Sequence, residues 1–281
     1  MSLDARVSDP IDHLQPGERA TGRFSRDRSV LRGGRRLIGP VLLLVVWQIA
    51  STTGLVDGQT LASPLAVAHA ASRLIADGQL AEHLAVSLRR AALGLTFGVA
   101  AGLCLAILSG LFRLGEDLID STMQILRSLP ILALIPLAIL WFGIGEEVKV
   151  ILVAMGTAFP IYINTHAAIR GIDPRYVDLA KTVGLSRLAL VRRVVLPGAL
   201  PGFFVGLRFS VTIAWLVLVV SEQINAASGI GYLMIQARDF GQTDVIVVGL
   251  LVYGCLGLTS NALVRAVERR ALRWRPGFQG S

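Results

Sequence analysis

Residues Ala91–Phe112 read AALGLTFGVAAGLCLAILSGLF and contain no charged side chain. A helix that spans the hydrocarbon core of a membrane needs about 20 mostly apolar residues, so this stretch predicts one such helix. Two further stretches of similar length, Leu37–Val56 and Val245–Val264, are equally free of charge. These runs predict a fold built from membrane-spanning helices.

Three further stretches complete the predicted set, although each is shorter or contains polar residues: Ser128–Gly145, Val150–Ile169 and Gly202–Val220. An amphipathic stretch precedes the first of these, so that span can begin within Asp117–Arg127. We therefore predict an all-α polytopic membrane protein with six transmembrane helices.

The composition excludes several other classes of protein. Hydrophobic residues make up 53% of the 281 residues and charged residues only 16%, whereas a globular domain carries about 25% charge. Lipid must cover part of such a chain, which argues against a cytoplasmic enzyme, a secreted disulfide scaffold and a disordered protein. Both cysteines, Cys104 and Cys255, lie in apolar stretches and predict neither a disulfide nor a metal site.

The distribution of Lys and Arg predicts the orientation in the membrane. With the N-terminus inside, the inner segments hold about four times as many basic residues as the outer segments. Both termini are therefore expected in the cytoplasm, and the net charge of +8 reflects anchoring residues rather than nucleic-acid binding. Residues 1–36 are polar and arginine-rich and predict a disordered tail, followed by a membrane domain over residues 37–278. A cleaved signal peptide is the alternative for the first apolar run, but no small-x-small site ends that run.

The largest inner loop contains a predicted helical hairpin. Asp173–Pro197 reads DPRYVDLAKTVGLSRLALVRRVVLP, which predicts one short helix over Arg175–Val183 and a second over Ser186–Val195. Gly184 can adopt the left-handed conformation that ends the first helix, and the serine that begins the second can cap it. The proline at the end of the stretch marks where the next span starts. Such a hairpin fits a groove on another protein, although an amphipathic loop lying on lipid headgroups is the alternative.

Polar or ionisable groups inside spans are costly, so each is a candidate for a substrate pathway. The candidates in the predicted spans or at their ends are Arg127, Asn164, Arg208, Thr212, Trp215 and Glu222. The guanidinium groups of Arg127 and Arg208 suit the oxygens of a sulfonate, but both residues can equally anchor helix ends at the inner interface. Asn164 is as compatible with helix–helix hydrogen bonding as with lining a pore. Glu222 is expected to form a salt bridge at a gate rather than to bind an anion.

Two segments are predicted to face outside, Gly143–Glu147 and Asn225–Tyr232. A partner protein can reach such segments. The acidic pair Glu146 and Glu147 either contacts basic residues of that partner or is simply solvated.

Two other classes of protein fit part of the sequence. A secondary transporter would also have six or more spans, but it would need acidic residues inside them for ion coupling, and the predicted span interiors contain none. An intramembrane serine protease would use Ser228 and His166 as a dyad. The predicted topology places Ser228 outside and His166 near the inner end of its span, so we reject the protease.

The hairpin resembles the EAA loop of permease subunits from bacterial ABC importers. Four residues match that motif and two depart from it: Ala180, Gly184, Leu196 and Pro197 match, whereas Asp178 replaces the usual Glu and Leu179 a common Ala. Further segments are similar to the permeases of aliphatic-sulfonate importers: Arg127–Gly145, Phe159–Asn164, Leu196–Arg208 and Ser228–Tyr232. The resemblance covers about residues 37–278, and permeases for taurine and nitrate share many of its features.

The resemblance implies a mechanism and a set of partners. In this family two permease copies form the pore, two ATPase subunits sit below them, and an extracytoplasmic binding protein delivers the substrate. The hairpin is then the coupling helix that inserts into the ATPase, and its coupling residues would be Asp178, Ala180, Lys181, Gly184, Leu185, Ser186, Leu196 and Pro197. The resemblance implies no catalytic activity and no cofactor for this chain, because the ATPase uses ATP and Mg.

The sequence also points to an energy source outside the chain. A P-loop needs Gly-x4-Gly-Lys-Ser/Thr, and the only two lysines, Lys149 and Lys181, do not follow a glycine. We therefore expect the permease subunit of an aliphatic-sulfonate importer in a bacterial plasma membrane. Taurine, nitrate or another small anion is the alternative substrate.

Overall fold

The computed structural model describes residues 27–54, 57, 58 and 60–274, and every regular element within these ranges is helical. The chain divides into two units, of which the first ends at Ile49 and the second begins at Ala50. The described part of the first unit is most of helix α1 (Asp27–Thr52). Residues 1–26 of the predicted disordered tail lie outside the described residues, and residues 27–36 differ from the prediction because they are helical in α1. Arginine is a good helix former, so the apolar helix extends back into this basic segment.

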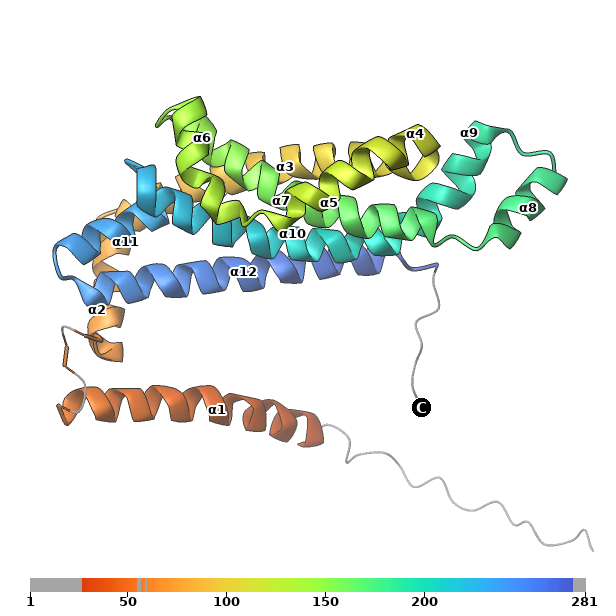
Figure 1. Cartoon of the computed structure of the whole chain (residues 1–281). Coiled ribbons are helices and arrows are strands. Elements are labelled where there is room, and N and C mark those ends of the chain that lie inside the picture. The colour runs from red at the N-terminus through yellow and green to blue at the C-terminus, as the bar shows by residue number, and fades with distance from the viewer. Residues whose placement is uncertain (1–26, 55–56, 59, 275–281) are drawn as a thin grey trace, which may run out of the picture. The chain divides into compact units, whose positions relative to one another are not determined.

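The second unit contains the other helices (Figure 1), which are α2 (Pro64–Ala76), α3 (Gln79–Leu111), α4 (Arg113–Gly115), η1 (Glu116–Asp120), α5 (Ser121–Ser128), η2 (Ile131–Leu134), α6 (Ile135–Phe142), α7 (Glu146–Arg170), α8 (Pro174–Thr182), α9 (Arg187–Leu190), η3 (Val191–Val195), α10 (Leu196–Asn225), α11 (Ile230–Asp239) and α12 (Thr243–Ala271).

Four helices of the second unit are long and apolar enough to span a membrane: α3, α7, α12 and the continuous helix Arg187–Ile224. A fifth candidate is broken, because Glu116–Ser128 and Ile131–Phe142 meet at a bend of 88°. Pro130 explains the break, since a proline cannot donate a backbone hydrogen bond and holds the residue before it in an extended conformation. The structure is therefore an all-helical polytopic membrane protein with four or five candidate spans among the described residues.

This number is lower than the six spans predicted. The difference lies in the predicted first span, Leu37–Val56, which falls partly outside the described residues. Its described apolar part, Val41–Thr52, is shorter than the other candidates and is therefore not counted among the four or five.

Helix α7 packs against both α3 and α10 and is the centre of the second unit. Gly94, Gly98 and Gly102 of α3 recur every four residues and therefore lie on one face of that helix. A Cβ atom at Gly98 would lie only 2.5 Å from the carbonyl oxygen of Ala154 in α7. Small residues matter here because apolar side chains gain little by leaving lipid, so membrane helices associate through close backbone packing.

The two ends of the second unit differ (Figure 1). The hairpin end carries α8, α9 and the last turn of α12. The distal end carries α2, α11 and the turn between α6 and α7.

Pro197 lies in the first turn of α10, where the next span was predicted to start, but the helix is not interrupted there. Helix α9 continues through the π-helical segment η3 directly into α10, so the hairpin and the span form one helix over Arg187–Ile224. A proline cannot donate to the carbonyl group four residues before it, and the wider π turn that precedes Pro197 accommodates the missing bond.

Replacing Gly98 by alanine should separate α3 from α7. We expect Gly98→Ala to lower the free energy of unfolding by about 1–3 kcal/mol, the usual cost of overpacking a tight contact. Gly254→Ala in α12 is the matched control, because a Cβ atom there would meet nothing within 4 Å. Denaturant titration of both variants in detergent measures the difference, and equal stability of the two would contradict the proposed role of Gly98.

Candidate functional site

The hairpin has the turn and the cap that the sequence predicts. Gly184 has a φ of 75°, and the backbone N–H groups of Gly184 and Leu185 donate to the carbonyl groups of Lys181 and Ala180 at 2.9 and 3.0 Å. These two bonds satisfy carbonyl groups that the end of α8 would otherwise leave free. Ser186 Oγ accepts a backbone N–H of α9 at 3.3 Å and caps that helix.

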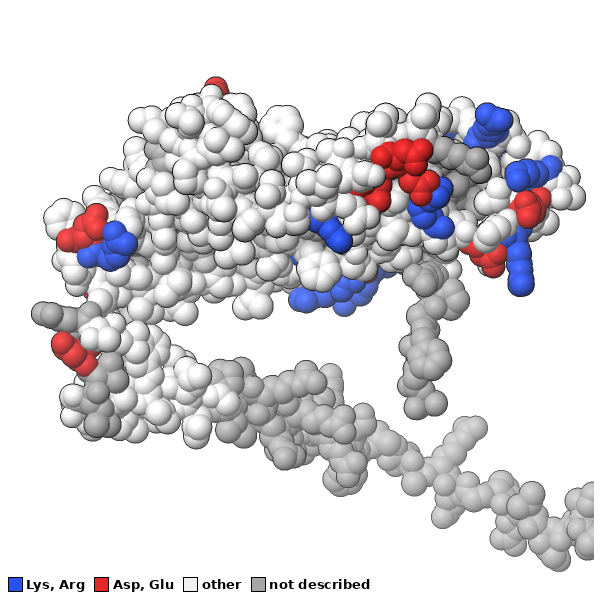
Figure 2. Space-filling view, in the orientation of Figure 1, with Lys and Arg blue, Asp and Glu red and all other residues white. Residues whose placement is uncertain are grey.

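The hairpin presents an apolar face to its surroundings. Four of its large hydrophobic residues are 61–71% exposed: Tyr176, Leu179, Val183 and Leu188. Asp178 and Lys181 form an exposed ion pair of 3.3 Å on the other side of α8. Figure 2 shows further charges of both signs at this end of the second unit. Exposed apolar patches with a charged rim are typical of surfaces that bind another protein.

The other predicted coupling residues lie inside the hairpin or beneath it. Ala180 is only 5% exposed. It lines a groove of about 690 Å³ between the hairpin and the spans, together with Leu185 and Pro197. Leu196 begins α10 and is 38% exposed. The eight predicted residues are therefore divided between an outer face and the base of the hairpin.

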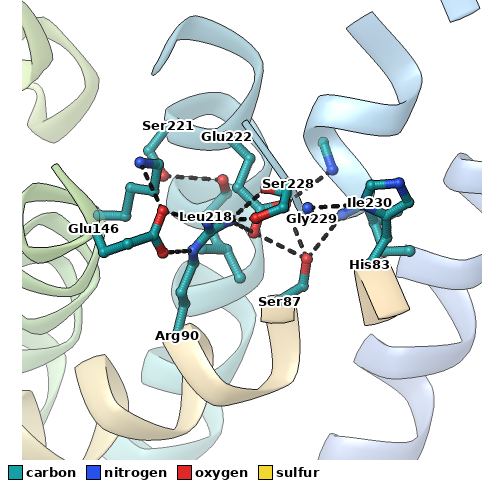
Figure 3. A network of polar contacts seen from close by, with 12 residues as sticks. His83, Ser87, Arg90, Glu146, Leu218, Ser221, Glu222, Ser228, Gly229 and Ile230 are labelled. Carbon is teal, nitrogen blue, oxygen red and sulfur yellow. Dashed lines mark hydrogen bonds and ion pairs between the residues drawn. The ribbon is translucent and has the colours of Figure 1, made fainter. Parts of the chain in front are cut away.

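A second cluster lies at the distal end, around the buried carboxylate of Glu222 (Figure 3). The Glu222 side chain is 0% exposed, although it is formally charged. Ser87 Oγ donates to its oxygens at 2.9 Å and Tyr253 OH donates at 3.0 Å. The backbone N–H of Gly231 donates at 2.9 Å. Four helices, α3, α10, α11 and α12, therefore meet at one carboxylate.

Arg90 of α3 supplies the positive charge for this cluster. Its Nη1 donates to Glu222 Oε1 at 2.7 Å and to the backbone oxygen of Ser228 at 2.6 Å. Its Nε and Nη2 hold the two carboxylate oxygens of Glu146 at 2.6 Å each, and Nη2 also contacts Ser228 Oγ at 3.2 Å. The five N–H donors of the guanidinium group are thus occupied. Arg90 is only 2% exposed.

The loop before α11 is held by the same group of residues. His83 Nδ1 accepts the backbone N–H of Gly229 at 3.1 Å, and Ser87 Oγ accepts that of Ile230 at 2.9 Å. Gly229 has a φ of 111°, and a Cβ atom there would collide with the Glu222 carboxylate. Only glycine therefore lets this loop pass over the buried charge.

The cluster is suited to fastening helices together rather than to binding a free anion. Both Arg90 and Glu222 have their hydrogen-bonding groups filled by other residues. Solvent reaches the cluster through Glu146, whose side chain is 57% exposed. Lys149 is 2% exposed at its side chain and contacts Glu146 at 3.4 Å, so two cations share that one carboxylate.

A third polar cluster joins η1 to α7. Tyr162 OH donates to Asp120 Oδ1 at 2.9 Å, and His166 Nδ1 lies 3.7 Å from the same oxygen. The rings of Tyr162 and His166 stack at 5.5 Å. Since Ser228 contacts Arg90 and His166 faces Asp120, the two do not form a catalytic dyad.

The six candidates for a substrate pathway do not converge on one site. Arg208 pairs with Glu268 at 2.9 Å. Asn164 donates to the carbonyl oxygen of Pro160 in its own helix at 2.9 Å. Thr212 Oγ1 likewise donates within its own helix, to the carbonyl oxygen of Arg208 at 3.2 Å. Arg127 is exposed at the end of α5.

Trp215 and Glu222 are linked through a third residue, Tyr253. Trp215 donates to Ser260 Oγ at 3.2 Å and packs edge-on against Tyr253, whose ring centre lies 6.2 Å away. Tyr253 in turn donates to Glu222. Glu222 forms a salt bridge, with Arg90 as its partner, and its role at a gate stays a prediction.

Sequence reasoning missed most of the cluster around Glu222. The predicted spans start at Ala91 and Val150, which leaves Arg90 and Lys149 just outside them, and Glu146 was expected to be solvated or to contact a partner. All three belong to helices, because α3 starts at Gln79 and α7 at Glu146. A usable signal was present in α3, where Ser87 and Arg90 precede the glycines at intervals of three or four residues and so share their buried face.

The chain matches the model of a known protein family over residues 94–273, described as binding-protein-dependent transport system inner membrane component. It is 49% identical to the putative aliphatic sulfonates transport permease protein SsuC of Escherichia coli (strain K12), over 85% of this chain and 91% of that protein. The protein of the same name from Bacillus subtilis (strain 168) is 38% identical over 87% and 88%. The taurine transport system permease protein TauC of Escherichia coli (strain K12) is 32% identical over 85% and 88%.

Two solved structures share the fold. One is described as an amino acid ABC transporter with histidines, with a TM-score of 0.59 and 20% identity over 71% of this chain and 97% of that chain. The other is an inward-facing conformation of the MetNI methionine ABC transporter, with a TM-score of 0.52 and 21% identity over 65% and 93%. Identities this low support the fold alone.

Removing the positive charge of Arg90 should destabilise the protein more than removing the charge of Glu222. Arg90→Gln leaves Glu222 buried without a cation, which costs about 3–5 kcal/mol. Glu222→Gln should cost less, because Arg90 keeps Glu146. The double variant should recover part of the loss caused by Arg90→Gln.

Unfolding by denaturant in detergent measures these free energies. Arg73→Gln is the control at the same end of the second unit, because Arg73 is 69% exposed in its pair with Asp244. Its loss should be about 1 kcal/mol or less. An equal loss for Arg90→Gln and Arg73→Gln would show that the buried pair is unimportant.

Proposed function

This chain belongs to the family of inner membrane components of binding-protein-dependent transport systems, so it is a permease subunit of an ABC importer, and we propose that it transports aliphatic sulfonates. The choice of substrate rests on the sequence identities to two kinds of relative. The two relatives named for aliphatic sulfonates are 49% and 38% identical to the chain, whereas the relative named for taurine is 32% identical. Taurine, nitrate or another small anion is the second candidate.

The hairpin is the proposed contact with the ATPase. Its exposed apolar face and its Asp178–Lys181 pair suit a protein surface, and the chain has no P-loop with which to hydrolyse ATP itself. The buried Ala180 and the left-handed Gly184 set the shape of the hairpin. Because α9 is continuous with α10, a movement of the hairpin would act directly on a membrane span.

The proposed topology follows from the position of the hairpin. The hairpin end would face the cytoplasm, with both termini on that side, and the distal end would face outward. The six proposed spans are α1, α3, the broken pair η1–α5 and η2–α6, α7, α10 and α12. We further propose that two copies of the chain form the pore above two ATPase subunits and that an extracytoplasmic binding protein docks at the distal end.

The cluster around Glu222 would hold the outer ends of the spans together during transport. A secondary transporter would need an acidic group that is free to take up a coupling ion. Glu222 is neutralised by Arg90 and saturated by hydrogen bonds from Ser87, Gly231 and Tyr253. This arrangement favours a structural role for the charge and an energy source outside the chain.

The substrate can be tested with the reconstituted complex of permease, ATPase and binding protein in proteoliposomes. Binding protein loaded with alkanesulfonates should stimulate ATP hydrolysis most strongly, and taurine or nitrate should stimulate it less. The rate of phosphate release measures the effect, with unloaded binding protein as the control. Stimulation by nitrate alone would refute the proposed substrate.

The coupling role can be tested at Gly184. Proline fixes φ near −65°, which is incompatible with the φ of 75° at this position, so Gly184→Pro should distort the hairpin. We expect the variant to insert into the membrane but to lose ATP-driven uptake. Gly184→Asn is the matched control, since asparagine tolerates the left-handed region and should keep uptake near that of the original protein. Normal uptake by the proline variant would refute the assignment.

A further inference from the structure

A groove of about 460 Å³ runs along the seam between α3 and α7 at the distal end. One end of it is charged and the remainder is apolar. The charged end is formed by Arg89, Arg90, Glu146 and Glu147. The apolar part is formed by Leu93, Phe97, Val150, Ile151 and Ala154.

Arg89 and Glu147 set the charge that a ligand would meet. Arg90 and Glu146 hold each other through two bonds of 2.6 Å and form the wall of the groove. Arg89 and Glu147 are both exposed, and neither forms an ion pair with another of the described residues. The groove therefore offers one cation and one anion, on different helices, that have no partner within the described part of the chain.

The dimensions of the groove match an amphiphile. Arg89 and Phe97 are eight residues apart on α3, which is about 12 Å along a helix. Glu147 and Ala154 on α7 are separated by about 10 Å. A charged end followed by an apolar channel of this length takes a polar head and the first part of a hydrocarbon chain. Phe97 is 59% exposed, so the channel is open along its side.

We propose that this groove binds one phospholipid whose headgroup carries a phosphate and a primary ammonium. The phosphate would contact the guanidinium of Arg89, and the ammonium would donate to the carboxylate of Glu147. An acyl chain would lie against Leu93, Phe97 and Ile151. A simple anion fits less well, because Glu147 would repel it, and a simple cation would be repelled by Arg89.

Binding of this lipid has a consequence for the cluster around Glu222. The headgroup would cover Glu146, the member of that cluster that solvent reaches. Removing water from a salt bridge strengthens it when its hydrogen bonds are complete, as they are for Arg90. The lipid would therefore support the contact between α3 and α7. The lipid can bind in this groove if the second unit lies in a membrane, whatever the substrate. The assignment of the lipid to the outer leaflet rests on the proposed function.

Native mass spectrometry of the purified transporter complex tests the proposal. The probes are phosphatidylethanolamine, phosphatidylcholine and phosphatidylglycerol with identical acyl chains, added singly to delipidated complex. We expect one phosphatidylethanolamine retained per permease copy. Phosphatidylcholine should bind roughly tenfold more weakly, because its quaternary ammonium cannot donate a hydrogen bond to Glu147.

Variants locate the bound lipid. Arg89→Gln and Glu147→Gln should each lose the preference for phosphatidylethanolamine, and Leu93→Trp should block the channel and lose the retained lipid. The matched controls are Arg238→Gln in α11 and Leu258→Trp in α12, which lie outside the groove and should bind as the original protein does. Circular dichroism and size-exclusion chromatography confirm that the variants remain folded complexes.

Several outcomes would overturn the proposal. They are retention of all three lipids to the same extent, retention that Leu93→Trp leaves unchanged, and a disulfide cross-link between two permease copies at Phe97→Cys. The last outcome would show that a second copy of the chain fills the groove. Because lipid binding is measured without transport substrate, a failure here is independent of whether the complex transports sulfonates.

Discussion

The close approach of α3 to α7 is the contact on which the other features of the second unit depend. Gly94, Gly98 and Gly102 allow it, since a side chain at Gly98 would meet the backbone of α7. The hydrophobic effect contributes little to helix association in lipid. Close backbone packing and polar contacts must therefore stabilise the association. The same approach brings Arg90 of α3 within 2.6 Å of Glu146 in α7. Without it Arg90 would lose Glu146, the carboxylate that α7 supplies.

The buried charges in turn determine the path of the chain between α10 and α11. A carboxylate in a low-dielectric interior is tolerated only when it is paired and hydrogen-bonded. Glu222 meets this condition through side chains of α3 and α12 and through the backbone of Gly231. The loop can donate that backbone bond only by passing over the carboxylate at Gly229, which has no side chain to collide with it. One charge thereby fixes a loop, a glycine and the contacts of three helices.

The parts of the structure that the sequence predicts well are local ones. The apolar runs predict the spans, and Gly184 and Ser186 predict the turn and the cap, because each of these depends on residues a few positions apart. The cluster around Glu222 joins residues separated by more than 130 positions, and no local pattern reports that Arg90 faces Glu222. The uncharged run starts at Ala91 and so leaves Arg90 outside the predicted span, although α3 begins at Gln79. The continuity of α9 with α10 was missed for a related reason, since a proline usually marks a helix end and the π turn that tolerates it leaves no sequence signature.

Because of that continuity, the helix from Arg187 to Ile224 connects the hairpin directly to the distal end of the second unit. Its 38 residues measure about 57 Å along the helix axis, which changes direction between α9 and α10 (Figure 1). Glu222 lies near the distal end of this helix, where its bonds to α3 and α12 would resist a movement of the helix. A movement of α9 would therefore reach the distal end of α10 through continuous helix, with no loop between them. The π turn η3 lies next to the hairpin, and it is the place where this helix would bend most easily.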